Sequence, residues 1–250
     1  MDSLNALLAQ KLRTLADDEV VLAQRLSEWV SQAPILEEDI AIANLAQDEL
    51  GHAQVYLELK KAIDGVEPDQ EVFFKDPLAF QNAVLVELPR GDWAYTMVRQ
   101  YLFDLYENLW LREAQKSAYP PLAEAAARIL KEERFHLRHA SLWVERLALG
   151  TEESHVRTAR ALEELWPYAR QLFQPLEGEE ALVEAGYLPD LGALWPEYED
   201  RARGFLEGFG LELPQKGYTP KSRFEHTEHL WPLVVLMQSV ARWDPEAKAW

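Results

Sequence analysis

Two Glu-x-x-His motifs are the residues of this sequence whose types and spacing could bind a metal. Glu49 with His52, and Glu133 with His136, each place an acid and an imidazole three residues apart. On an α-helix this spacing brings both side chains to one face, and carboxylate with imidazole suits iron or manganese. A third match, Glu152–His155, has no facing partner. We interpret it as chance, because about 0.7 such matches are expected at random.

Four long segments, read in the 3–4 spacing of a bundle core, each give an apolar seam that acids interrupt at one level. Glu19 and Glu49 are equally far from Pro34, and Glu107 and Glu133 are equally far from Pro120. Residues equally far from the turn of an antiparallel hairpin face each other. Each hairpin should therefore hold its acids level. The fourth seam is predicted to be Leu122, Ala126, Ile129, Glu133, His136, Ala140, Trp143 and Leu147.

The predicted seams carry several acids and no lysine or arginine. Buried carboxylates cannot all stay ionised without a cation, so they either take up protons or surround metal ions. Two Glu-x-x-His motifs with a carboxylate from each of two further helices form the di-iron carboxylate pattern. A metal-free polar core is the alternative. The predicted ligands are Glu19, Glu49, His52, Asp104, Glu107, Glu133 and His136.

Glycine and proline fall in clusters, which is how helical chains are interrupted. The segments between them predict two antiparallel helix hairpins with a long connection from about residue 64 to residue 92, like the crossover of ferritin-like bundles. Thr151 is suited to begin the next helix. No strand alternation is seen. We predict an all-α, ferritin-like four-helix bundle with additional C-terminal helices: one domain over residues 1–250, with a core at 1–149 and appended helices at 150–250.

Lesser candidates surround these motifs. Asp48 and Glu132 precede the motif glutamates, where an outer carboxylate commonly orients a ligand histidine; ordinary helix surface is the alternative. The stretch Glu225–His229 could bind a metal, but a helix cap or an interface patch is favoured. Aromatic residues of the C-terminal hundred residues are expected partly in the core and partly at an interface: Trp166, Trp195, Phe205, Phe209, Trp231, Trp243 and Trp250.

Composition excludes several functions. A net charge of −18 argues against nucleic acid and against an anionic membrane surface as partners. No cysteine is present, so thiolate sites and iron–sulfur clusters are excluded. The sequence also lacks a Gly-rich dinucleotide-binding loop, so we expect no flavin in this chain. Neither a signal peptide nor a membrane span is expected. We expect a cytoplasmic location.

Six stretches resemble the PaaC family, the C subunits of bacterial phenylacetyl-CoA epoxidase. The resemblance runs over nearly the whole chain and is most specific at Gln24–Trp29, Glu87–Asp92, Arg99–Tyr101, Phe135–Arg138, Glu145–Leu147 and His226–Leu230.

The resemblance implies a role in aerobic phenylacetate breakdown, in a complex that activates O₂ and epoxidises the ring of phenylacetyl-CoA. A homologous A subunit holds the catalytic di-iron site and is the expected partner, and a separate reductase supplies electrons. By analogy with the A subunit, Asp104 rivals Glu107 as the ligand of the third helix. C subunits can be degenerate at these positions, whereas this chain keeps all seven residues.

These observations favour a protein that mainly scaffolds the A subunit, and that can bind iron itself, manganese being the weaker alternative. The runner-up is a freestanding di-iron carboxylate oxidase. A metal-storage protein is a third class, which nothing in the sequence favours.

Overall fold

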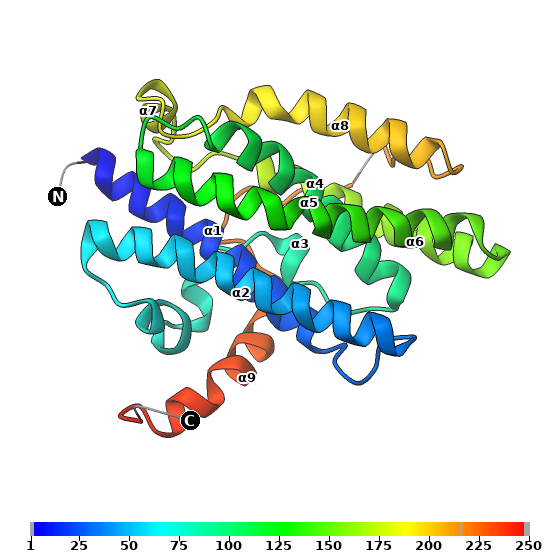
Figure 1. The fold of residues 1–250 in the computed structure, drawn as a ribbon, viewed down its shortest axis with the longest axis horizontal. Coiled ribbons are helices and arrows are strands. Elements are labelled where there is room, and N and C mark those ends of the chain that lie inside the picture. Colours follow the sequence, from blue (N-terminus) through cyan, green and yellow to red (C-terminus); the bar gives the residue numbers. More distant parts are fainter. Residues whose placement is uncertain (1–2, 216, 248–250) are drawn as a thin grey trace. The chain divides into compact units, whose positions relative to one another are not determined.

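The structure, a computed structural model, describes residues 3–215 and 217–247 (Figure 1), and these residues form helices with no β-strand among them. The all-α prediction is confirmed, and the helical content is that expected of a ferritin-like bundle. No described helix is both long enough and apolar enough to cross a membrane. The elements are α1 (Ser3–Ser27), α2 (Leu36–Asp64), η1 (Gln70–Phe74), η2 (Pro77–Ala79), α3 (Val84–Glu87), α4 (Trp93–Ala114), α5 (Pro120–Leu149), α6 (Glu152–Ala169), η3 (Arg170–Phe173), α7 (Glu180–Glu184), α8 (Leu191–Glu207) and α9 (Leu230–Trp243).

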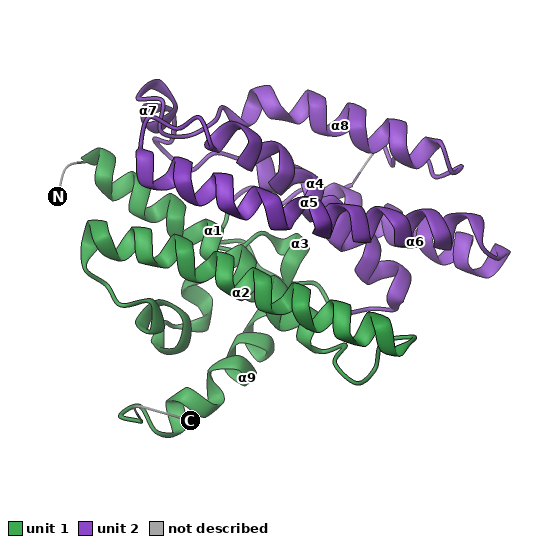
Figure 2. Ribbon diagram, viewed as in Figure 1, with its two compact units in different colours: residues 1–89, 223–250 green, residues 90–222 purple. Residues whose placement is uncertain are grey.

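The chain divides into two compact units (Figure 2). Unit 1 comprises residues 1–89 and 223–250, and unit 2 comprises residues 90–222. Each unit contains one of the predicted hairpins: α1 with α2 in unit 1, and α4 with α5 in unit 2. The appended C-terminal segment is divided between them. The single-domain interpretation stays a prediction.

The hairpin of unit 1 turns through residues 28–35. Ser31 takes a positive φ of 69° there, and its N–H donates to Oδ1 of Asp39 at 2.6 Å. Such a backbone is uncommon outside glycine, and the side-chain acceptor helps to hold it. At its other end α2 stops at Gly65, whose φ of 79° suits glycine and whose N–H donates to the carbonyl of Lys61. Both ends of α2 are therefore defined by local sequence.

The helices of the unit 2 hairpin also begin at residues whose local sequence favours a helix start. The side chain of Asp92 accepts the N–H of Tyr95 at 2.9 Å and begins α4. Pro120 begins α5, where its missing N–H costs no hydrogen bond. Thr151 and Ser154 form a capping box at the start of α6, which confirms Thr151 as a helix start.

The predicted inner face of α5 holds as far as Ala140 and is wrong beyond it. The structure buries Val144 and Ala148, while Trp143 and Leu147 are only partly covered. Two steps of four residues from Ala140 turn the buried side of the helix by roughly 80°, so the last turns of α5 pack through a different side than the regular 3–4 spacing predicted. Trp143 instead packs edge-on against Trp93, with ring centroids 5.4 Å apart.

The long helices also bury cations beside the predicted seam positions. Arg25, Lys60 and Arg99 are 8%, 5% and 0% exposed. The Nζ of Lys60 lies 2.6 Å from carboxylate oxygens of both Asp64 and Glu71. The absence of lysine and arginine thus holds for the seam positions but not for the whole buried surface of these helices.

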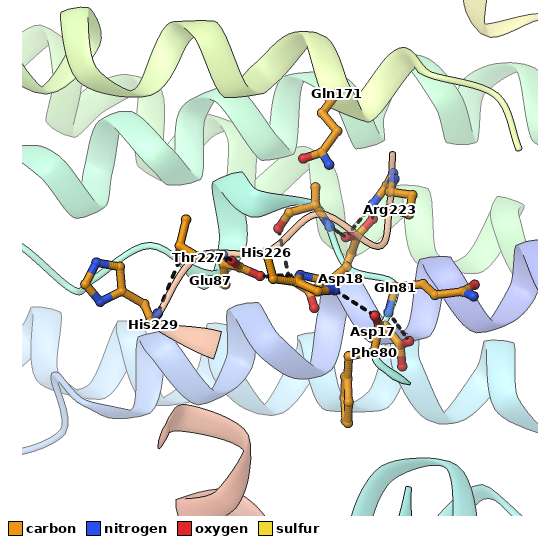
Figure 3. A network of polar contacts seen from close by, with 12 residues as sticks. Asp17, Asp18, Phe80, Gln81, Glu87, Gln171, Arg223, His226, Thr227 and His229 are labelled. Atoms are coloured by element: carbon orange, nitrogen blue, oxygen red, sulfur yellow. Dashed lines mark hydrogen bonds and ion pairs between the residues drawn. The ribbon is translucent and has the colours of Figure 1, made fainter. Parts of the chain in front are cut away.

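A buried polar network fastens the segment before α9 to the rest of unit 1 (Figure 3). Nη1 of Arg223 donates to both carboxylate oxygens of Asp18, at 2.8 Å each. The carboxylate of Glu87 accepts from the N–H and the hydroxyl of Thr227 and lies 2.8 Å from Nδ1 of His226. Two stretches that carry the family resemblance, at 87–92 and at 226–230, therefore meet here.

His226 is engaged through both ring nitrogens. Nδ1 faces Glu87, and Nε2 lies 2.8 Å from the carbonyl oxygen of Phe80, to which it must donate. Burial lowers the pKa of His226, but the hydrogen bond and the charge of Glu87 raise it, and the net shift is upward. His226 and Thr227 of Glu225–His229 therefore form an internal tie. His229 occupies the N-cap position of α9, as the helix-cap interpretation expects, but its side chain makes no capping hydrogen bond.

The aromatic residues of the C-terminal hundred residues separate into two groups. Within unit 2, the rings of Trp166 and Trp195 pack around Tyr198 at centroid distances of 5.8 and 5.5 Å. Within unit 1, Trp231 and Trp243 are 54% and 87% exposed. The expectation of partial outward exposure is confirmed for these two residues. Trp250 lies outside the described residues.

Candidate metal centre

Unit 1 brings three of the predicted ligands together. Glu19 on α1 and Glu49 and His52 on α2 each offer a ligand atom, and these atoms lie within 4.8 Å of one another. All three side chains are buried, at 1%, 0% and 2% exposed. The equal distances of Glu19 and Glu49 from Pro34 do place these acids level across the hairpin.

Unit 2 forms a second motif of the same kind. Nδ1 of His136 lies 2.8 Å from Oε1 of Glu133, and in unit 1 the corresponding distance from His52 to Glu49 is 3.3 Å. Glu133 and His136 are 0% and 3% exposed. In both predicted Glu-x-x-His motifs the carboxylate and the imidazole therefore lie side by side on one face of the helix.

The third-helix candidates differ in their surroundings. Asp104 and Glu107 are both buried on α4. Oδ1 of Asp104 accepts a hydrogen bond of 2.7 Å from Nε2 of Gln100, one turn earlier. One oxygen of Asp104 is thus held by its own helix, which favours Glu107 as the ligand and gives Asp104 a supporting position.

Asn108 links α4 to α5 at the height of the motif. Its Nδ2 donates at 2.9 Å to the main-chain carbonyl of Asp104 and at 2.9 Å to that of Glu133. A side-chain amide shared between two helices fixes their axial register. The predicted level of Glu107 with Glu133 agrees with this contact, which runs from the residue after Glu107 to the main chain of Glu133 itself. Asn108 could not be recognised from the sequence, because an asparagine within a helix gives no periodic signal.

The spacing of these groups fits a metal ion. With metal–ligand bonds of about 2.1 Å, adjacent ligands of one ion lie about 3 Å apart and opposite ligands about 4 Å apart. The Glu–His distances of 3.3 and 2.8 Å correspond to adjacent ligands. The ligand atoms of Glu19, Glu49 and His52 all lie within 4.8 Å of one another, which is also compatible with opposite ligands of one ion. Carboxylate oxygen with imidazole nitrogen is also a donor set that iron and manganese accept.

Two acids beside Glu19 have a different role. Asp17 and Asp18 are 3% and 1% exposed, so three consecutive acids of α1 are buried, and a helix cannot point three consecutive side chains at one seam. Asp17 pairs with Lys75 and accepts the N–H of Gln81 at 2.8 Å. Burial lowers the pKa of Lys75, and the charge of Asp17 opposes that shift. The run of three acids in the sequence is the one signal that could have indicated this network in advance.

The lesser candidates are less buried. Asp48 is partly exposed and Glu132 is exposed, and the outer-carboxylate role stays a prediction for both. In the third Glu-x-x-His match, Glu152 is exposed and Nδ1 of His155 lies 2.9 Å from the carbonyl of Ala148. That histidine is tied to the preceding helix, which agrees with the interpretation as a chance match.

Helix hairpins that bury acids and histidines at one level define an all-helical protein of the ferritin-like class. The chain belongs to the family described as "Phenylacetic acid catabolic protein", which it matches over residues 2–250. It is 37% identical over 242 residues, 96% of this chain and 97% of the relative, to the C subunit of 1,2-phenylacetyl-CoA epoxidase from Escherichia coli (strain K12). It is also 26% identical over 176 residues, 70% of this chain and 56% of the relative, to the A subunit of the same enzyme.

Proposed function

We propose that this chain is the C-type subunit of a multicomponent oxygenase that epoxidises the aromatic ring of phenylacetyl-CoA. The observation that carries the proposal is the 37% identity to a C subunit over 96% of the chain. The additional similarity to an A subunit supports a related A-type chain as the partner. In this proposal the A-type subunit is the main site of turnover, and this chain stabilises it.

The proposal includes metal binding by this chain. Glu19, Glu49 and His52 in unit 1, with Glu107, Glu133 and His136 in unit 2, are the residues proposed to hold iron. Asp104 stays beside Glu107, held by Gln100. Iron, when bound, supplies the redox chemistry that O₂ activation needs. Manganese accepts the same donors and is the alternative metal.

The protein's own contribution is orientation and exclusion of water. Fully buried apolar side chains, such as Leu22 on α1 and Ile42 on α2, accompany the acids along their helices. A dry environment strengthens attraction between carboxylates and a cation, and it makes the same carboxylates costly without one. In this proposal a separate reductase supplies the electrons. The chain has no cysteine and so offers no thiolates for an iron–sulfur cluster of its own.

A freestanding di-iron oxidase is the second candidate, and the retained acids and histidines of both motifs favour it. The two functions make opposite predictions for the isolated chain. A scaffold needs its A-type partner for turnover, whereas a freestanding oxidase consumes O₂ with a reductase alone.

The test is metal analysis and turnover, for the chain alone and after co-expression with the A-type subunit of the same organism. We expect co-elution of the two chains, up to two iron ions in this chain, and phenylacetyl-CoA epoxidation only by the pair. Separate elution of the two chains at micromolar concentration, together with epoxidation by the isolated chain and reductase, would replace the scaffold with the freestanding oxidase.

A further inference from the structure

Unit 1 has a groove of about 490 Å³ between α1 and α2, bordered by η1 and α9. Small side chains from both long helices line it, including Ala23 of α1 and Ala43 and Ala46 of α2. Leu50 of α2 and Met237 of α9 form parts of its walls. Every lining residue is uncharged. In a chain with a net charge of −18, an accessible surface free of charge calls for an explanation.

The groove continues into an uncharged stripe on α2. Leu36, Ile40, Ala43, Gln47 and Leu50 follow one another at intervals of four, three, four and three residues, which keeps them on one face of the helix. Leu36, Ile40 and Leu50 are 71%, 56% and 48% exposed. Apolar residues at this spacing are the seam of a helix that packs against another helix.

The helix that borders the groove adds apolar surface of its own. On α9, Trp231, Leu236, Val240 and Trp243 are 54%, 63%, 57% and 87% exposed. The core of a protein interface contains few charged residues and many aromatic ones. Tryptophan is enriched among the residues that dominate binding energy.

The chemistry of this surface excludes several occupants. A CoA ester carries phosphates and requires cationic side chains, and nucleic acid or an anionic membrane requires a basic face. The groove offers none of these groups. Its small floor residues leave space between α1 and α2 for the side-chain ridge of a third helix. The fitting occupant is a helix with an uncharged, apolar face.

We propose that the surface formed by the groove, the α2 stripe and the outer face of α9 is where the A-type subunit docks through an apolar helix. The outer face of α9 is formed by Leu236, Val240 and Trp243, which follow at intervals of four and three residues. The proposal rests on the proposed function, which makes the A-type chain the obligate partner. Obligate interfaces commonly bury more than about 2,000 Å² and have an apolar core, and unit 1 supplies such a core in these three elements. A second copy of this chain is the competing occupant.

The test uses the full-length chain with the double substitution Ile40→Glu and Leu50→Glu. Both side chains are exposed and glutamate is a good helix former, so the variant should fold, which circular dichroism and a thermal melt of the isolated chain check. Leu50→Met is the conservative control. Leu142→Glu on α5, at a site 55% exposed, is the matched control on unit 2.

Binding to the purified A-type subunit is measured by titration calorimetry, and the mass of the isolated chain by light scattering. We expect Kd for the A-type subunit to rise by at least about 100-fold in the double variant, because binding buries two unpaired carboxylates. The two controls should stay within about threefold of wild type.

Unchanged binding of the double variant, or a larger loss in Leu142→Glu, overturns the docking surface while leaving the proposed function intact. A homodimer that the double variant disrupts, with binding to the A-type subunit preserved, assigns the surface to self-association and also overturns the proposal. Failure of the wild-type chain to bind the A-type subunit instead overturns the partner in the proposed function.

Discussion

Replacing Glu49 with glutamine removes one charge from the buried cluster of unit 1 while nearly keeping its shape. Glu49 is fully buried, and its ligand atom lies within 4.8 Å of that of Glu19. Two unit charges at that distance repel by about 3.5 kcal/mol at an effective dielectric constant of about 20. Buried carboxylates without a cation can also take up protons, which would relieve part of this repulsion. We therefore expect the metal-free Glu49→Gln variant to be equal to wild type in stability or more stable by up to about 2 kcal/mol.

Metal should reverse this order. A ligand present at 100 times its Kd stabilises the folded state by about 2.7 kcal/mol, and wild type should gain an increment of that size with Fe²⁺ or Mn²⁺ under anaerobic conditions. The Glu49→Gln variant should lose most of it, because a neutral amide is a poor substitute for a carboxylate ligand. The free energy of unfolding is measured by urea denaturation, with chelator and with metal.

Glu58→Gln is the matched control, since Glu58 lies exposed on the same helix; it should follow wild type in both conditions. Two results would refute the reasoning. An equal metal-induced gain in Glu49→Gln and wild type would remove Glu49 from the ligands. A loss of more than about 2 kcal/mol in the metal-free variant would show that the carboxylate is a structural hydrogen-bond acceptor.

Two further predictions concern the network that holds the C-terminal segment. Arg223→Ala should lower the free energy of unfolding by about 3–5 kcal/mol, because it leaves Asp18 buried without its cation; adding Asp18→Asn should recover part of the loss, and a cost below about 1 kcal/mol would contradict the pairing. His226→Gln should destabilise most at low pH. The folded-state pKa of His226 is raised, so the stability it contributes is complete below about pH 6.5 and disappears as pH rises through the folded-state pKa. Thermal melts of both proteins between pH 6 and pH 9 should therefore converge, and a constant difference would show that the charge is unimportant.

The positions of the candidate ligands along the helices were predictable because both signals are local. A Glu-x-x-His motif shares one helix face whatever surrounds the helix, and equal distances from a turn determine which residues of an antiparallel hairpin are level. For Glu19, Glu49 and His52 the measured separations agree with that prediction. Helix ends followed the same logic at Gly65 and Thr151, where backbone conformation and capping depend on a few neighbouring residues.

The roles of other buried polar residues depended on contacts between segments distant in the chain. The sequence places Asp17, Asp18 and Glu19 side by side, yet only the fold directs Asp18 to Arg223, which is 205 residues away. Likewise, Glu87 and His226 meet because the chain returns to unit 1 after residue 222.

The sequence by itself determined the helix faces, the hairpins and the acid–histidine motifs, because helical periodicity and turn chemistry are properties of neighbouring residues. The tertiary structure alone decided that α5 buries Val144 in place of Trp143, that Asp104 is held by Gln100, and that unit 1 leaves an uncharged groove accessible. These outcomes depend on which side chains compete for the same space and the same hydrogen-bond donors. That competition is settled only when segments far apart in the chain pack together.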